Sequence, residues 1–177
     1  MKLRDRDIQE VVLTDVCPFT LGTEVSVDNG YFDVDNPYLP IIERNTVIPV
    51  SRTQTVYTAH DNQTRVRVKI LQGESRIATN NISLGEIIVP VPSAPKGQEA
   101  VDITYTYDVN SLLEVVVKVL STGVSRKVVV QGGESKLSDE EIEERLKKLS
   151  YLKQNPRDDE ENKLLLLRGE RLYEETV

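Results

Sequence analysis

Cysteine is nearly absent from this chain of 177 residues, which limits how the fold can be stabilised. Cys17 is the single cysteine, so no disulfide bond can form within the chain. A chain without disulfides suits a reducing compartment, and we expect a cytoplasmic protein. A reactive thiol needs a nearby base or a helix N-terminus, whereas Cys17 stands before Pro18 in an apolar stretch. We therefore expect a packed Cys17 side chain.

Long apolar runs and excess positive charge are missing as well. No segment approaches the ~20 apolar residues of a membrane span, and no signal-peptide pattern follows the charged N-terminus, so we expect no membrane contact. The formal net charge of -7 argues against a nucleic-acid partner, because acidic proteins repel phosphate backbones. Hydrophobic residues make up 38% of the chain, enough for a sizeable core.

Catalytic and cofactor-binding patterns are equally scarce. The chain has no glycine-rich phosphate-binding loop. His60 beside Asp61 is the only pair that resembles a catalytic dyad, yet neighbours in a strand or turn point apart and no oriented nucleophile accompanies them. We expect no catalytic residue, no metal site and no cofactor in this chain.

The stretch Thr53–Gln72 carries the clearest pattern. Val66, Val68 and Ile70 alternate with basic residues, which predicts a half-buried strand. A second alternating run precedes it across the turn at residues 60–63, so the two runs predict a hairpin. Its apolar face is either plain sandwich core or, in part, the lining of a groove for an apolar ligand.

The remaining sequence divides into a β part and a helical part. Short apolar runs at 8- to 12-residue spacing, separated by turn residues, predict an antiparallel β-sandwich over residues 16–134. Ser138 and Glu141 form a capping box, and Ile142, Leu146 and Leu149 lie on one face of the helix that follows. We expect a linker over residues 1–15 and a short helical segment over residues 135–177.

Five short strings stand in a fixed order along the chain: V-L-T-D-V-C-P-F-T-L-G-T-E, E-R-N-T-V-I-P, T-A-H-D-N-Q, L-Q-G-E and A-P-K-G. Together they resemble the substrate-binding region of DnaK-type heat-shock chaperones, from about Glu10 to about Leu149. The V-L-T-D-V-C-P-F string and the short C-terminus are most similar to the HscC branch. The resemblance implies a β-sandwich that holds an extended peptide beneath a helical lid.

The resemblance also implies partners. An ATPase domain that binds ATP and Mg belongs before Met1 and is missing here, and Val11, Val12, Leu13 and Asp15 match the linker that docks on it. Unfolded or extended apolar peptides are the implied ligands, and a J-domain protein the implied co-chaperone.

The site residues are carried over position by position. Those matching the peptide channel are Thr23, Val25, Val56, Thr58, Ala59, Val66, Val68 and Val101. Ser26 and Ala59 match the arch over the bound peptide, and Asp61 and Lys96 match a charged latch between loop and lid.

Some positions depart from the family pattern. Residues 27–40 are longer than the usual turn, Thr14 replaces the usual linker leucine, and the helical part is short. The alternative function is a docking or self-assembly module that binds a dedicated partner, with Leu164–Leu167 as the contact. Generic apolar peptides should bind only to a chaperone module.

Overall fold

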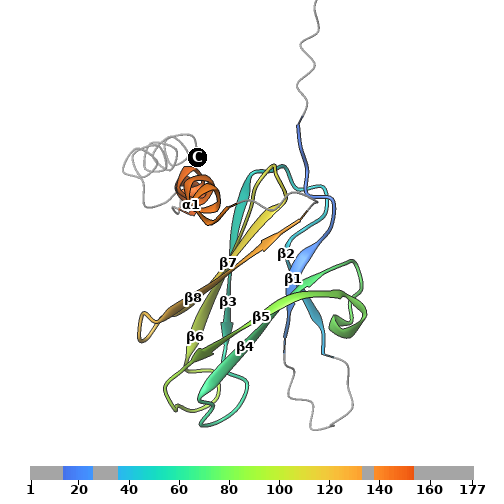
Figure 1. Cartoon of the computed structure of the whole chain (residues 1–177). Helices are drawn as coiled ribbons and strands as arrows, with labels where there is room; N and C mark the ends of the chain where they lie inside the picture. Colours follow the sequence, from blue (N-terminus) through green and yellow to red (C-terminus); the bar gives the residue numbers. More distant parts are fainter. Residues whose placement is uncertain (1–13, 26–35, 133–137, 154–177) are drawn as a thin grey trace, which may run out of the picture.

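The structure, a computed structural model, describes residues 14–25, 36–132 and 138–153. These residues form two antiparallel four-stranded sheets and a helical segment (Figure 1). In spatial order, the first sheet contains β2 (Tyr38–Ile42), β1 (Leu21–Glu24), β4 (Arg65–Gln72) and β5 (Ile82–Pro90). The second contains β3 (Val50–Tyr57), β6 (Ala100–Tyr107), β7 (Leu112–Val119) and β8 (Ser125–Gln131). The helical elements are η1 (Ala78–Asn80), α1 (Asp139–Lys148) and η2 (Ser150–Lys153).

The two sheets pack face to face because the strands alternate between apolar and polar side chains. In β4, Val66, Val68 and Ile70 are buried, whereas Arg65 and Arg67 are exposed. The buried side chains of both sheets form one cluster, which includes Leu21, Ile42, Val89, Ile103, Tyr105, Val115 and Val117. The predicted fold class, an antiparallel β-sandwich followed by helix, is confirmed.

The predicted hairpin over Thr53–Gln72 is wrong, although both of its strands exist. β3 pairs with β6 in the second sheet, while β4 pairs with β5 and β1 in the first. Residues 58–64 therefore cross from one sheet to the other. Alternation reports which way side chains point and carries no information on which strand lies alongside, so the pattern alone could not exclude this connection.

β1 pairs unequally with its two neighbours in the first sheet. β1 pairs with β2 along its whole length but pairs with β4 only at Leu21 and Gly22. Gly22 permits this arrangement, since a Cβ there would lie 2.2 Å from the Leu39 carbonyl oxygen of β2. The buried Tyr105 hydroxyl of β6 donates a hydrogen bond of 2.7 Å to the Gly22 carbonyl and ties β1 to the opposite sheet.

β7 lies between β6 and β8, as its nearly continuous apolar run predicted. β8 and β5 are edge strands of different sheets, and one side chain joins them. The Arg126 guanidinium of β8 donates a hydrogen bond of 2.8 Å to the Ile88 carbonyl of β5. This hydrogen bond links the two sheets on the side where β5 and β8 form their edges.

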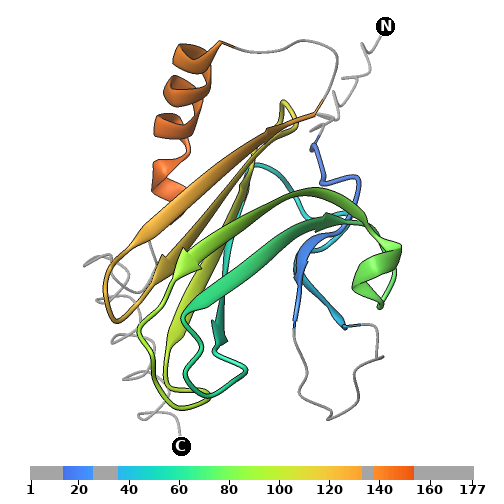
Figure 2. The same ribbon diagram turned by 60° about the horizontal axis from the view of Figure 1, so that its bottom comes forward.

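The capping box at the start of α1 is confirmed. The Glu141 amide donates to the Ser138 hydroxyl oxygen, and the Ser138 amide donates to the Glu141 carboxylate. These hydrogen bonds from Ser138 lower the pKa of the Glu141 carboxyl below its ordinary value. Ile142 and Leu146 pack on Leu112 and Val129, which places α1 on the outer face of β7 and β8 (Figure 2).

Helices capable of crossing a bilayer are absent from the parts of the chain that the structure describes. Cys17 is 1% exposed, and its thiol donates a hydrogen bond to the Phe19 carbonyl. Burial raises the pKa of this thiol. The predicted packed cysteine is therefore confirmed. The predicted boundaries between linker, sandwich and helical segment stay predictions.

Tyr105→Phe should destabilise the fold, because it leaves the buried Gly22 carbonyl without its donor from β6. An unsatisfied buried acceptor costs about 1–3 kcal/mol. Tyr107→Phe is the matched control on the same strand and face, since its hydroxyl makes no hydrogen bond to the described residues. Urea denaturation should show the loss for Tyr105→Phe alone. Equal midpoints for both variants would show that the Tyr105 bond does not hold β1.

Candidate functional site

A cleft opens in the first sheet where β1 turns away from β4. Beyond the two pairs at Leu21 and Gly22, no described strand pairs with residues 65–70 of β4 on the β1 side. The cavity here has a volume of about 190 Å³. Its lining comes from β1, β3, β4, β6 and the loop after β3: Thr23, Glu24, Val25, Val56, Tyr57, Ala59, Gln63, Arg65, Val66, Arg67, Val68 and Ile103.

The floor of the cleft is apolar and continuous with the core. Val66 is 9% exposed and Val68 is 1% exposed, and both belong to the main buried cluster together with Ile103. The half-buried Val56 packs against that cluster from β3. One extended face therefore serves as sandwich core at its centre and as cavity wall at its end, and the binding of an apolar ligand at this wall stays a prediction.

Six of the predicted channel residues lie together on the cavity wall: Thr23, Val25, Val56, Ala59, Val66 and Val68. Val101 does not line it; this residue is fully buried, pairs with Val56, and lies two positions before the lining residue Ile103. Thr58 is buried in the loop beside the cavity, and Ser26 lies outside the described residues. The peptide-binding roles of all these residues stay predictions.

Sequence reasoning missed six lining residues: Glu24, Tyr57, Gln63, Arg65, Arg67 and Ile103. Ile103 could have been found, because it follows Val101 on the same face of an alternating strand. For Arg65 and Arg67, the alternating pattern predicts only that they lie on the solvent-facing side of a strand. Their place at the cleft follows from the parting of β1 and β4, which the sequence pattern does not report.

Of the predicted linker residues, Val11, Val12 and Leu13 lie outside the described residues. The Asp15 carbonyl accepts a hydrogen bond of 3.0 Å from the Ile48 amide, and Val16 bridges Val47. The chain has thus joined the sandwich at Asp15. The docking role of these four residues stays a prediction.

Two loops beside the cleft are joined by hydrogen bonds. The Asp61 carboxylate accepts a bond of 2.8 Å from the Lys96 amide, and the Asn62 amide donates to the Ala94 carbonyl. The Gly97 amide donates to the Thr58 carbonyl at 2.9 Å. Asp61 and Lys96 are therefore in contact, through the Lys96 backbone amide and between two loops. A latch to a lid stays a prediction.

Within the first of these loops, Gln63 fixes the backbone next to the cavity. Its side-chain oxygen accepts hydrogen bonds from the amides of Ala59 and His60, at 3.0 and 3.3 Å. Its side-chain nitrogen donates to the Arg65 carbonyl at 2.7 Å. One glutamine thus holds Ala59 in place relative to the start of β4.

The outer rim of the cleft is charged. The Lys69 ammonium lies 2.5 Å from the Glu24 carboxylate, joining β4 to β1 across the gap. Asn36 also donates a hydrogen bond to this carboxylate. Burial alone would raise the pKa of Glu24, but the hydrogen bonds from Lys69 and Asn36 outweigh it and lower this pKa below its ordinary value. Glu24 is therefore ionised at neutral pH.

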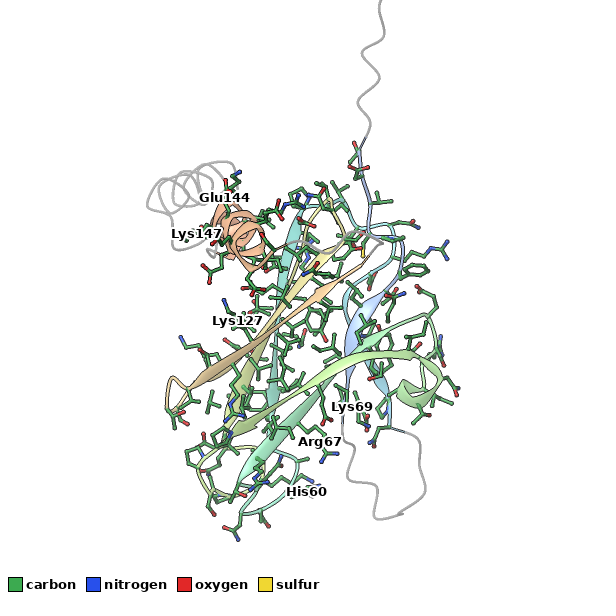
Figure 3. The ribbon with its side chains drawn as sticks, in the orientation of Figure 1. His60, Arg67, Lys69, Lys127, Glu144 and Lys147 are labelled. Atoms are coloured by element: carbon green, nitrogen blue, oxygen red, sulfur yellow. The ribbon has the colours of Figure 1, made fainter. Side chains whose placement is uncertain are left out.

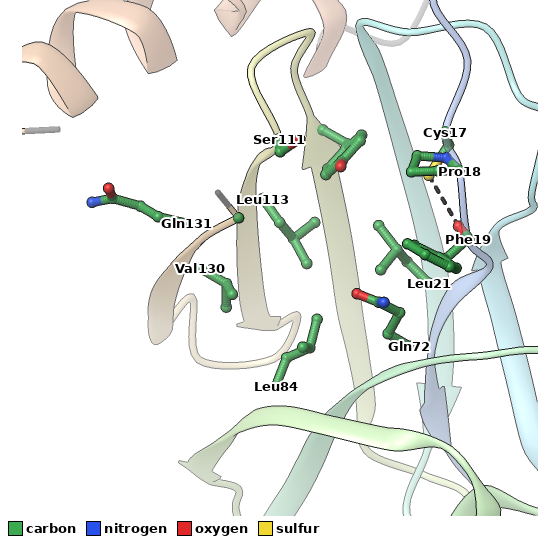
Figure 4. Close-up of a pocket in the computed structure, with 12 residues that line it drawn as sticks. Cys17, Pro18, Phe19, Leu21, Gln72, Leu84, Ser111, Leu113, Val130 and Gln131 are labelled. Carbon is green, nitrogen blue, oxygen red and sulfur yellow. Dashed lines mark hydrogen bonds between the residues drawn. The ribbon is translucent and has the colours of Figure 1, made fainter. Parts of the chain in front are cut away.

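Two other cavities differ from the cleft in character. The first, of about 100 Å³, lies between the sheets and is bordered by Cys17, Phe19, Leu84 and Val130 (Figure 4). The second, of about 300 Å³, has Glu74 and Arg44 in its lining. Hydrogen bonds from the Thr20 amide and hydroxyl lower the pKa of Glu74. Neither lies at the gap where β1 parts from β4.

The described residues include no group of histidine, cysteine or acidic side chains placed to hold a metal ion. Nor do Tyr57, His60 or any other residue at the cleft form a nucleophile hydrogen-bonded to an oriented base. The arrangement can bind: it offers a cavity with an apolar floor, a stretch of β4 edge that no described strand pairs, and a charged rim.

Comparison with known proteins agrees with this architecture. The family described as Hsp70 protein matches residues 3–171. The mitochondrial 70 kDa heat shock protein of Pisum sativum is 36% identical over 161 residues, which is 90% of this chain and 22% of that protein. The chaperone protein DnaK of Thermosipho melanesiensis is 40% identical over 135 residues, 76% of this chain and 21% of that protein.

The chain therefore belongs to the Hsp70 family, and the DnaK-type resemblance is confirmed. It spans about a fifth of the length of these relatives.

Asp61→Ala should loosen the two loops without unfolding the sandwich. The exposed carboxylate contributes about 1 kcal/mol through its bond to Lys96, so the melting temperature should fall by less than ~8 °C. Asp61→Asn is less informative because it keeps an acceptor oxygen.

Hydrogen exchange should show faster opening of the Lys96 amide in Asp61→Ala. Asp102→Ala is the control, since it removes a hydrogen bond from Thr55 in the other sheet. Unchanged exchange at Lys96, or cooperative unfolding, would contradict a local loop-joining role for Asp61.

Proposed function

We propose that this chain is a chaperone module that holds extended, apolar segments of unfolded polypeptides in the cleft between β1 and β4. The observation that supports this best is the apolar floor at a place where no described strand pairs with the edge of β4. Val66 and Val68 offer the floor, and β4 offers its backbone on the β1 side. Six residues matching the family's peptide channel lie on this wall.

The chemistry of such a cleft gives broad selectivity. Backbone hydrogen bonds to an extended chain supply affinity without requiring a particular sequence. An apolar cavity of about 150 Å³ can hold a molecule of the size of benzene, so the cleft has room for one aliphatic or small aromatic side chain. Burying a leucine side chain there contributes about 1.5–3 kcal/mol. The ligand is then any unfolded segment with an accessible apolar residue.

We infer that the longer protein couples this binding to ATP hydrolysis. The ATP and Mg sites would belong to its own ATPase domain, because the described residues here form neither a phosphate-binding loop nor an acidic metal cluster. Val11, Val12, Leu13 and Asp15 would dock on that domain, and a J-domain co-chaperone would act with it. The V-L-T-D-V-C-P-F string favours the HscC branch, and the lack of disulfides favours a cytoplasmic protein.

A docking or self-assembly module for a dedicated partner is the second candidate; its predicted contact, Leu164–Leu167, lies outside the described residues. Val16 and Val47 bridge each other and are 41% and 57% exposed, so this end of the sandwich presents apolar surface. Titration with generic leucine-centred peptides separates the two functions, because a dedicated docking surface would not bind them.

Val66→Phe tests the cleft directly. The added ring should occupy the space meant for a ligand side chain, so the fold should persist while affinity for a leucine-centred peptide falls at least ~10-fold. Circular dichroism and fluorescence anisotropy measure the two effects.

Val117→Phe is the matched control for Val66→Phe. Val117 is fully buried in the same cluster and lines no cavity on the cleft, so enlarging it should destabilise the fold by about 1–3 kcal/mol or more. A folded Val66→Phe protein with wild-type peptide affinity would contradict the proposal that the cleft is the peptide-binding site. Unfolding of both variants would leave Val66 a core residue and favour the docking function.

The helical segment is proposed as a short lid. Among the described residues α1 packs on β7 and β8, and no residue of α1 or η2 lines the cleft, so a lid would need residues beyond Lys153. Deleting residues 137–177 should leave peptide binding measurable and speed peptide release, because lids act mainly on dissociation. Stopped-flow release at the wild-type rate would argue against a lid. Loss of the β-sheet spectrum would instead make α1 part of the core.

A further inference from the structure

The cleft has a basic rim in a chain whose net charge is -7. We propose that the cleft selects peptide segments in which an acidic residue stands next to the apolar residue that enters the cleft floor (the anchor). Arg65 and Arg67 would bind the acidic side chain. The inference rests on the proposed peptide binding and adds the charge of the preferred ligand. It gives a function to Arg65 and Arg67, two lining residues to which the family resemblance assigns none.

The three cations of β4 differ in the partners they already have. Lys69 is engaged with Glu24 at 2.5 Å. Arg67 lies 3.9 Å from Glu86, and the two side chains are 63% and 54% exposed, so their attraction is weak and easily exchanged for another carboxylate. Arg65 forms no ion pair with any described residue. The arginines are therefore available to a ligand, and Lys69 is not.

Strand geometry places these arginines beside the anchor. Val66 and Val68 point into the sandwich, so Arg65 and Arg67 point to the outer face of the same cavity. Successive side chains of an extended ligand also point in opposite directions. When one apolar side chain enters the floor, its neighbour points outward, toward the guanidinium groups. Arginine binds carboxylate with paired, charge-assisted hydrogen bonds.

The carboxylates around the cleft do not cancel this preference. Glu24 is matched by Lys69 and Asn36, and the Asp61 carboxylate accepts a bond from the Lys96 amide. Glu86 is the acid on the neighbouring strand; it stands opposite Lys69 in the strand register and lies 3.9 Å from Arg67. Among the described residues, Arg65 is thus left without an ion-pair partner at the mouth of the cavity.

The test uses three leucine-centred peptides that differ only in the flanking residues: aspartate, serine or lysine. Fluorescence anisotropy with the full chain at low salt should give at least about fivefold tighter binding of the aspartate-flanked than of the lysine-flanked peptide. The ratio should shrink in ~0.5 M salt, where exposed charges are screened. The serine-flanked peptide should lie between them.

Charge reversal identifies the residues responsible. Arg65→Glu should lower the ratio, and Arg65→Glu with Arg67→Glu should invert it. Both side chains are exposed, so the melting temperature should change little. Lys127→Glu makes the same charge change on β8, far from Arg67 and His60 (Figure 3), and should leave the ratio unchanged.

Each failure has a distinct meaning. If the serine-flanked peptide binds but aspartate and lysine flanks are equivalent, the charge preference is wrong and the peptide-binding function stands. The same holds if the double variant keeps the wild-type ratio, or if Lys127→Glu changes it as much. If none of the three peptides binds, both the preference and the proposed function are wrong.

Discussion

The parting of β1 from β4 after Gly22 is the constraint on which the site depends. β1 must approach β2 so closely at Gly22 that a Cβ would collide with the Leu39 carbonyl oxygen. The Tyr105 hydroxyl holds the Gly22 carbonyl from the opposite sheet. These contacts keep β1 on the β2 side while β4 continues alongside β5. The position of the cleft is therefore set by backbone pairing, and its lining side chains determine which ligands it can bind.

Because the floor is an extension of the core, stability and recognition share residues. Val66 and Val68 are packed by the same neighbours that hold the sandwich together. A cavity of about 190 Å³ at the end of a packed face is a place where the core is left incomplete. An apolar ligand side chain completes it, and the gain is the ordinary gain of burying hydrocarbon. Such a site distinguishes apolar from polar residues well and one apolar residue from another poorly.

The sequence predicts those features that depend on local spacing. The alternation of Val66, Val68 and Ile70 predicted a strand, and Ser138 with Glu141 predicted the start of α1; both are confirmed. Features that depend on long-range pairing were not predicted. The hairpin was wrong because β3 and β4 belong to different sheets. The Lys69–Glu24 ion pair and the arginines at the cleft were missed for the same reason, since residues far apart in sequence bring them together.

The hydrogen bond from Arg126 to β5 affects whether two copies of this chain can pair through their strand edges. A protein with an exposed strand edge can capture an extended segment anywhere along that edge, including one from another copy of itself. Here the Ile88 carbonyl on β5 is occupied by Arg126, the edge strand β2 contains Pro40, and β8 presents Arg126 and Lys127. Proline and charged side chains discourage strand addition. Strand addition is thereby discouraged at three of the four described edge strands, β2, β5 and β8, whereas the gap beside β4 stays open to an extended chain among the described strands.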